Sequence, residues 1–123
     1  MKKPLLIAVV DDDESVRESL PDLLREFGFA VEAFPSAQVF LSSPNVASTR
    51  CLILDVAMPG MSGPELHTTL KLGGHAIPVI FITAHGDAGD RQKLMRTGVV
   101  DCLMKPFSEA QLLKALSAAF PVD

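Results

Sequence analysis

Short apolar runs alternate with longer, more polar segments along the whole chain. Each run spans four to six residues, and apolar character over that length is typical of strands buried on both faces of a parallel sheet. Glu32 interrupts the second run, which indicates a strand near a sheet edge with one partly exposed face. The predicted strands are Leu5–Val10, Phe29–Phe34, Cys51–Leu54, Val79–Ile82 and about Val100–Met104.

The segments that follow the strands are expected to form helices. Their apolar residues recur at helical spacing, and each segment begins at a residue that can cap a helix. Pro21 lies inside the first segment, where we expect a bend rather than a break because the apolar spacing continues through it. The predicted helices start at Asp13 or Ser15, at Ser36, at Ser62 or Gly63, at Asp87 or Asp90 and at Ser108, and they end near Gly28, Ser42, Gly73, Gly98 and Phe120.

This alternation predicts a doubly wound α/β domain with a five-stranded parallel sheet and five helices. The composition agrees with one globular domain over residues 1–123, since 48% of the residues are hydrophobic and 21% are charged. Proteins that bind duplex nucleic acid need a basic face, and a formal net charge of −4 gives no reason to expect one, so we expect no direct binding of nucleic acid by this domain. No apolar run approaches the ~18–20 residues of a membrane span. We therefore expect a cytoplasmic protein without membrane contact.

The cysteines and two of the three histidines are expected to take no part in metal binding or redox chemistry. Cys51 and Cys102 lie in predicted buried strands and should be reduced thiols. His67 and His75 are expected on the surface, because no metal-ligand spacing joins them to other residues.

Polar residues directly follow four of the five predicted strands. Asp11 and Asp12 follow the first, Asp55 the third, Thr83 the fourth and Lys105 the fifth. The carboxyl ends of parallel strands share one edge of the sheet, where open α/β sheets bind their ligands. One polar residue there would simply mark the end of a strand, but this combination of acids, hydroxyl and base indicates a site.

The chemistry of these side chains points to a metal ion. Two carboxylates about 4 Å apart repel each other by about 4 kcal/mol at an effective dielectric constant near 20, so three need a cation or a proton. Hard oxygen ligands favour Mg²⁺, with Mn²⁺ as a substitute, over zinc. Beside such an ion Asp55 can be an oxygen nucleophile towards phosphorus, with Thr83 and Lys105 contacting the phosphoryl oxygens.

The motifs that carry these residues resemble the receiver domains of two-component response regulators. The matching segments are VVDDD, LDVAMPGMSG, FITAHGD and GVVDCLMKPF, in the same order and spacing. The resemblance covers essentially the whole chain and is specific for the segments jointly rather than for any one of them. HGD and KPF are further similar to receivers that precede helix-turn-helix output domains. The resemblance implies a flavodoxin-like strand order, 2-1-3-4-5.

The resemblance also implies a role for each acid of the site. Asp55 would be the phosphoacceptor, taking a phosphoryl group from a sensor histidine kinase. Asp12 would bind Mg²⁺ directly, Asp11 directly or through water, Asp55 through its carboxylate and Ala57 through its backbone carbonyl. The domain would promote its own phosphorylation and slow dephosphorylation without being a turnover enzyme.

The switch that follows phosphorylation is implied in the same way. Thr83 would move towards the phosphoryl group and Lys105 would pair with it. The bond between Lys105 and Pro106 would be a cis peptide. The change would reach the surface formed by the fourth helix, fifth strand and fifth helix, residues Asp87 to Phe120, which would bind a partner, an output domain or a second copy of the chain.

Several residues depart from the family pattern or extend it. Receivers usually carry Tyr or Phe where this chain has Cys102, so Cys102 leaves the aromatic part of the switch in doubt. Asp13 is a third acid, expected to cap the first helix rather than to bind metal. Ala57 is small where many relatives have a long side chain, and His85 could line the resulting opening; both are candidate modulators of phosphate lifetime.

Two other functions compete with this interpretation. A Mg²⁺-dependent phosphatase with an aspartate nucleophile would carry a second acid two residues later, where this chain has Ala57, and would need a cap domain. A phosphorylation-independent interaction module would be expected to lack Asp55, Thr83 or Lys105, yet all three are present. Only the missing aromatic at Cys102 favours the interaction module.

Overall fold

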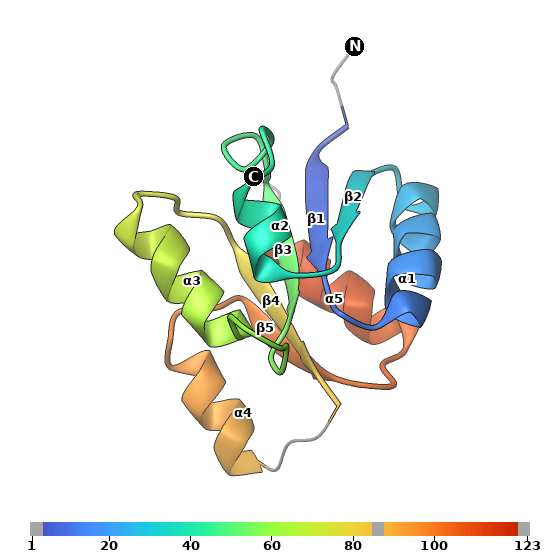
Figure 1. The fold of residues 1–123 in the computed structure, drawn as a ribbon. Coiled ribbons are helices and arrows are strands. Elements are labelled where there is room, and N and C mark those ends of the chain that lie inside the picture. The colour runs from blue at the N-terminus through green and yellow to red at the C-terminus, as the bar shows by residue number, and fades with distance from the viewer. Residues whose placement is uncertain (1–3, 85–87, 121–123) are drawn as a thin grey trace.

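The computed structural model describes residues 4–84 and 88–120 as one five-stranded parallel sheet with helices on both faces (Figure 1). The strand order is β2-β1-β3-β4-β5, so the predicted doubly wound fold and its order are confirmed. The strands are β1 (Leu6–Val10), β2 (Ala30–Phe34), β3 (Cys51–Asp55), β4 (Val79–Thr83) and β5 (Asp101–Met104). The helices are α1 (Glu14–Glu26), α2 (Ala37–Leu41), α3 (Gly63–Leu72), α4 (Ala88–Met95) and α5 (Glu109–Ala119).

Two hydrophobic cores hold the helices on the sheet. On one face, Leu24 of α1 and Leu112 of α5 pack against β-strand residues such as Ile53. On the other, Phe40 of α2 and Leu66 of α3 pack against the opposite side chains of the same strands, with α4 alongside (Figure 1). Burying each such side chain contributes roughly 1.5–3 kcal/mol. The three central strands, β1, β3 and β4, are therefore covered on both sides.

Local capping fixes where the helices begin. Asp13 accepts a hydrogen bond from the backbone N–H of Ser15 at 2.9 Å, as predicted for a cap of α1. Ser62 starts α3 and Ser108 starts α5, each in a reciprocal capping box with the residue three positions later. Pro21 lies inside a continuous α1, so the prediction that it would not break this helix is confirmed.

The helix α4 differs from its prediction. It ends at Met95, short of the end predicted near Gly98, and the chain then turns through Gly98, whose φ is +88°. The predicted start at Asp87 lies outside the described residues. None of the described helices has the length and apolar character that a membrane crossing requires.

His67 contradicts the prediction of a surface position. Its side chain is buried, and its ring meets Phe81 of β4 edge-on with 6.0 Å between centroids. The reason is its place on α3, where Gly63 and Leu70, one turn away on either side, face the same core. Burial, and then the charge of Lys71, lower the pKa of the imidazole. His75 remains partly exposed.

Candidate functional site

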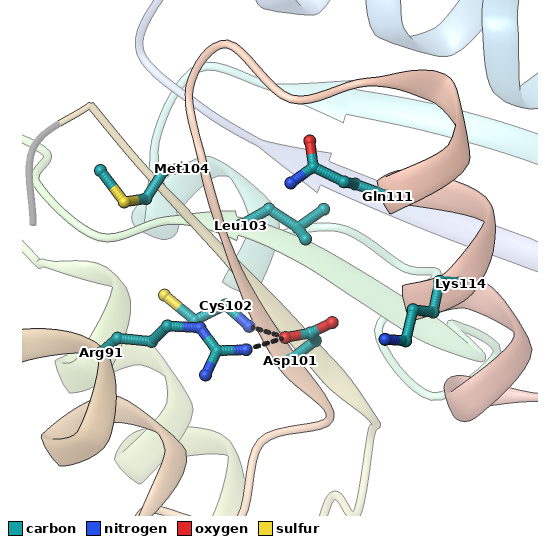
Figure 2. Close-up of a pocket in the computed structure, with 7 residues that line it drawn as sticks. All are labelled: Arg91, Asp101, Cys102, Leu103, Met104, Gln111 and Lys114. Carbon is teal, nitrogen blue, oxygen red and sulfur yellow. Dashed lines mark hydrogen bonds and ion pairs between the residues drawn. The ribbon is translucent and has the colours of Figure 1, made fainter. Parts of the chain in front are cut away.

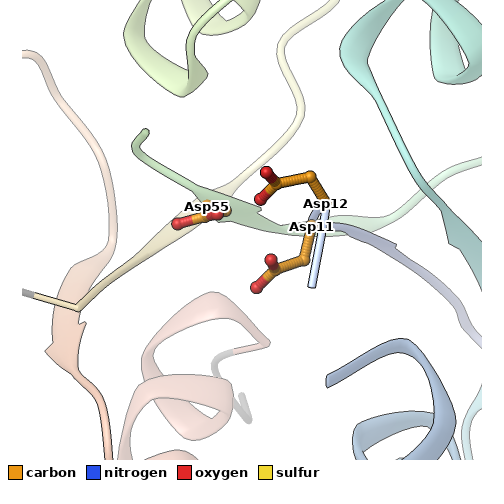
Figure 3. Close-up of side chains that lie close together, drawn as sticks. All are labelled: Asp11, Asp12 and Asp55. Carbon is orange, nitrogen blue, oxygen red and sulfur yellow. The ribbon is translucent and has the colours of Figure 1, made fainter. Parts of the chain in front are cut away.

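Three carboxylates from two neighbouring strands meet at the carboxyl edge of the sheet (Figure 3). The register pairs Val10 of β1 with Leu54 of β3, so the residues that come next, Asp11 and Asp55, lie side by side. One carboxylate oxygen from each of Asp11, Asp12 and Asp55 lies within 4.8 Å of the others. Asp11 and Asp55 are buried and Asp12 is exposed. The predicted acid cluster is therefore present, with an open side at Asp12.

Both oxygens of the Asp11 carboxylate are held in place. Oδ1 accepts a hydrogen bond from the backbone N–H of Asp13 at 2.9 Å, and Oδ2 lies 2.9 Å from Nζ of Lys105. The side chain of Asp11 is 0% exposed. Apart from the ion pair with Lys105, its buried Oδ2 has no hydrogen-bond donor among the described residues. A buried carboxylate with so few donors is suited to bind a cation.

Lys105, which follows the edge strand β5, brings positive charge to the acids. Its Nζ lies 2.9 Å from Asp11 and 4.0 Å from Oδ1 of Asp55. Its backbone N–H donates to the carbonyl of Thr83 at 2.8 Å, which ties the residue to the end of β4. The Lys105–Pro106 peptide bond is cis, as the resemblance implies.

The pKa values follow from this crowding of charges. Burial, and then the charge of Asp11, raise the pKa of Asp55 to about 7, and the opposing charge of Lys105 limits the rise. Burial by itself would lower the pKa of Lys105, but the contact with Asp11 and the charge of Asp55 raise it overall. Asp55 thus holds a proton in the metal-free protein more readily than an ordinary aspartate does. A cation that displaces this proton would convert Asp55 to the nucleophilic form.

The donor set fits Mg²⁺. Three carboxylates accompanied by one ammonium group leave an excess of negative charge, and all the candidate side-chain ligands are hard oxygens. Ala57 lies two residues after Asp55 in an exposed loop, where a backbone carbonyl can add a fourth oxygen. This loop is closed by hydrogen bonds from the backbone N–H of Val56 to Ile82 and from that of Gly63 to Val56, each 3.0 Å long.

Of the remaining predicted site residues, Thr83 and Asp13 are described by the structure and His85 is not. Thr83 is the last residue of β4 and is partly exposed. The register pairs Asp55 with Ile82, so Thr83 follows directly at the same edge. Asp13 caps α1, and its hydrogen bonds with Ser15 lower its pKa, in agreement with the prediction. His85 lies outside the described residues.

Cys102 lies away from the acids, in the core between β5 and α4. Cys102 pairs in register with Phe81 of β4. It also borders a pocket of about 260 Å³ between α4 and α5 (Figure 2). At this pocket Oδ1 of Asp101 accepts hydrogen bonds from the backbone N–H of Cys102 at 2.8 Å and from Arg91 at 3.0 Å. Cys51 and Cys102 are free thiols, as expected. Burial raises the pKa of Cys102, and that of Cys51 to about 12.

Two residues contact backbone atoms of the site in ways that the sequence does not predict. Arg17 donates from Nη1 to the backbone carbonyl of Asp11 at 3.0 Å. Gly63 lies so close to Asp55 that a Cβ there would be 2.3 Å from the Asp55 carbonyl oxygen. Nothing in the local pattern distinguishes Arg17 from other helix arginines. The signal for Gly63 is a glycine at the start of a helix immediately after the loop.

We expect the Lys105→Met variant to be less stable than the wild type without divalent cations, by about 1–3 kcal/mol, because buried Asp11 loses its ion-pair partner. Saturating Mg²⁺ should recover more stability in this variant than in the wild type. Thermal unfolding with and without Mg²⁺ measures both effects. Lys114→Met, an exposed lysine on α5, is the matched control and should change stability by less than about 0.5 kcal/mol. Equal stability and equal Mg²⁺ response of the Lys105 variant would contradict the role assigned to this ion pair.

Comparison with known proteins agrees with the architecture. Residues 7–117 match the response regulator receiver domain family. The chain is 47% identical over 114 residues to the response regulator protein TodT of Pseudomonas putida, covering 93% of this chain and 50% of TodT. It is 46% identical over 118 residues to nodulation protein W of Bradyrhizobium diazoefficiens, covering 96% of this chain and 52% of that protein.

Solved structures show the same relationship. The structure of response regulator StyR superposes with a TM-score of 0.85 at 47% identity, over 96% of this chain and 59% of that one. FixJ-N superposes with a TM-score of 0.83 at 37% identity, over 100% of this chain and 99% of that one. The chain spans about half the length of the curated relatives it matches. It belongs to the family of response regulator receiver domains of two-component signal transduction.

Proposed function

We propose that this receiver accepts a phosphoryl group on Asp55 from a sensor histidine kinase in a Mg²⁺-dependent reaction. The observation that carries the proposal is the position of the Asp55 carboxylate, within 4.8 Å of the Asp11 and Asp12 oxygens and 4.0 Å from the ammonium group of Lys105. One nucleophilic carboxylate thus lies between a cation-binding acid pair and a positive charge. That arrangement is what transfer of a phosphoryl group to a carboxylate requires.

The transfer itself needs few protein groups. An oxygen of Asp55 attacks the phosphorus of a phosphohistidine, an O–P bond forms, the P–N bond breaks, and the leaving imidazole nitrogen takes up a proton. Asp11, Asp12, Asp55 and the Ala57 carbonyl would hold Mg²⁺, which supplies charge neutralisation for the phosphoryl oxygens. Lys105 and the hydroxyl of Thr83 would contact the same oxygens.

Dephosphorylation would restore the starting carboxylate. A water oxygen attacks phosphorus, the bond between phosphorus and the Asp55 oxygen breaks, and inorganic phosphate leaves. Ala57, which is exposed beside Asp55, leaves room for that water, and His85 is the second candidate modulator of this rate. The domain belongs to a family of signalling modules and would itself promote both reactions.

The output would follow from the movement of Lys105 towards the phosphoryl group. Lys105 now contacts Asp11, and its backbone is bonded to Thr83, so a shift of either residue reaches Pro106 and β5. The neighbouring surface, residues Asp87 to Phe120, would then bind an output domain, a partner or a second copy of the chain in the cytoplasm. Cys102 lies under this surface beside the Arg91–Asp101 ion pair (Figure 2), and would transmit the change without an aromatic ring.

Phosphorylation by acetyl phosphate, read by intact mass, tests the proposal. We expect a phosphoryl-mass adduct on the wild type with Mg²⁺ or Mn²⁺ and none with a chelator. Asp55→Asn should abolish the adduct, while Asp22→Asn, an exposed aspartate on α1, should retain it. Absence of an adduct on a wild type that demonstrably binds Mg²⁺ would overturn the proposal in favour of a phosphorylation-independent interaction module.

A further inference from the structure

The backbone carbonyl of Asp11 is a buried hydrogen-bond acceptor just beyond the end of β1, where the backbone hydrogen bonds between β1 and β2 stop. Asp11 itself is 0% exposed. Its N–H donates at 3.1 Å to the carbonyl of Phe34, the last residue of β2. Among the described residues no backbone N–H donates to this carbonyl, so a buried acceptor here needs a side-chain donor.

Arg17 supplies that donor. It is on the first turns of α1, and its Nη1 lies 3.0 Å from the Asp11 carbonyl oxygen. Among the described residues it makes no ion pair with a carboxylate, whereas Arg25 and Arg91 each do. The guanidinium of Arg17 therefore binds this backbone oxygen and not a neighbouring carboxylate. Because a guanidinium is planar and rigid, it fixes the direction of the acceptor better than a lysine ammonium does.

The bond to Arg17 acts on the peptide unit that joins Asp11 to Asp12. The Asp11 side chain is already held by Asp13 and Lys105, but the exposed Asp12 carboxylate depends on the orientation of its backbone. That orientation is set by the Asp11 carbonyl on one side and by the Asp13 cap on the other. A rotation of this peptide would turn Asp12 away from Asp11 and Asp55, with which it shares the cluster.

We propose that Arg17 is a positioning residue for the cation site, holding the Asp11–Asp12 peptide so that Asp12 faces the other two acids. The inference rests on the proposed function, because it takes the acid cluster to bind Mg²⁺. It assigns Arg17 no contact with the ion or with the phosphoryl group. Partners of this kind, which orient a metal ligand without touching the metal, change metal affinity by about 10–100-fold when they are removed.

Mg²⁺ titration of the unphosphorylated protein by calorimetry tests this inference. We expect Arg17→Met to weaken Mg²⁺ binding by about 10-fold and Arg17→Lys to fall between that variant and the wild type, because lysine keeps the charge and a donor. Arg25→Met is the matched control. Arg25 is also on α1 and donates to a backbone carbonyl, that of Val31, at 3.3 Å, but away from the acids. The Mg²⁺ affinity of the Arg25→Met variant should stay within about twofold of the wild-type affinity.

A second readout separates positioning from general destabilisation. In metal-free Arg17→Met, the carbonyl ¹³C resonance of Asp11 and the amide ¹⁵N resonance of Asp12 should shift, while those of β3 and β4 remain in place. Wild-type affinity and unshifted resonances in Arg17→Met would overturn the inference and leave the proposed function intact. A wild type that binds no Mg²⁺ would instead overturn the cation site itself, and the inference with it.

Discussion

Replacing Gly63 by alanine will destabilise the protein by about 2–3 kcal/mol, although alanine is the better helix former. A Cβ at Gly63 would lie 2.3 Å from the carbonyl oxygen of Asp55 and 3.1 Å from Cα of Val56. Both are backbone atoms at the end of a buried strand, so they cannot swing aside as a flexible side chain would. Either α3 must move away from the sheet or the backbone that carries Asp55 must shift.

Urea unfolding measures this effect, and Mg²⁺ binding shows whether the site shifts too. Gly73→Ala is the matched control at the other end of the same helix. Its φ is −82°, and a Cβ there would meet its nearest neighbours at 3.5 Å, so a change of less than about 1 kcal/mol is expected. A Gly63→Ala variant with the wild-type unfolding midpoint would show that the Asp55 backbone yields easily, contrary to the close packing described above.

The Asp55→Asn substitution should stabilise the metal-free protein at pH 8. Asp55 has a pKa of about 7 in the folded chain against an ordinary value of 3.8, so the folded state binds its proton more tightly than the unfolded state does. Below pH 4 the carboxyl group is neutral in both states and favours folding fully. That contribution is lost as the pH rises from about 4 to about 7, and above pH 7 the folded protein carries a disfavoured charge.

Asparagine has no such charge at any pH. The variant should therefore exceed the wild type in stability by roughly 1–3 kcal/mol at pH 8, less than the ~4 kcal/mol that the full pKa difference allows, because Lys105 and Asp11 can readjust. The gap should close below pH 4. Mg²⁺ should reverse the order by stabilising only the wild type. Urea unfolding across this pH range with a chelator gives the measurement.

The control for this experiment is Asp22→Asn. Asp22 is exposed on α1 and pairs with Arg25 at 3.4 Å, so its loss should change stability by less than about 1 kcal/mol at every pH. An Asp55→Asn variant that is less stable than the wild type at pH 8 without divalent cations would mean that the charged form of Asp55 is not disfavoured in the fold.

Most of the architecture could be predicted because its signals are local. Each apolar run stops within one residue of the observed strand end, since a charged residue or a hydroxyl follows four of the runs and Pro35 follows the other. Ser36, Ser62 and Ser108 start helices as expected. The gathering of acids, Thr83 and Lys105 at one edge follows from parallel strands alone.

The features that could not be predicted depend on contacts between distant segments. The sequence places Lys105 near three acids but does not say that its Nζ lies 2.9 Å from Asp11 and 4.0 Å from Asp55. The absence of a metal-ligand spacing around His67 predicts a surface position, but the spacing does not reveal that the ring packs edge-on against Phe81 of β4. Arg17 and Gly63 act on backbone oxygens of the site, and no side-chain pattern marks such contacts.

The strand order also divides the site by how readily its parts open. Asp11 follows β1 and Asp55 ends β3, and each of these strands has a partner on both sides. Lys105 follows β5, which among the described strands pairs with β4 alone. Local opening begins at sheet margins and spares the centre. Amide protons near Lys105 should therefore exchange with solvent through small fluctuations, and those of β1 and β3 only when the domain unfolds. The acids then form a fixed half of the site, and the lysine a half that can detach and return while the fold stays intact.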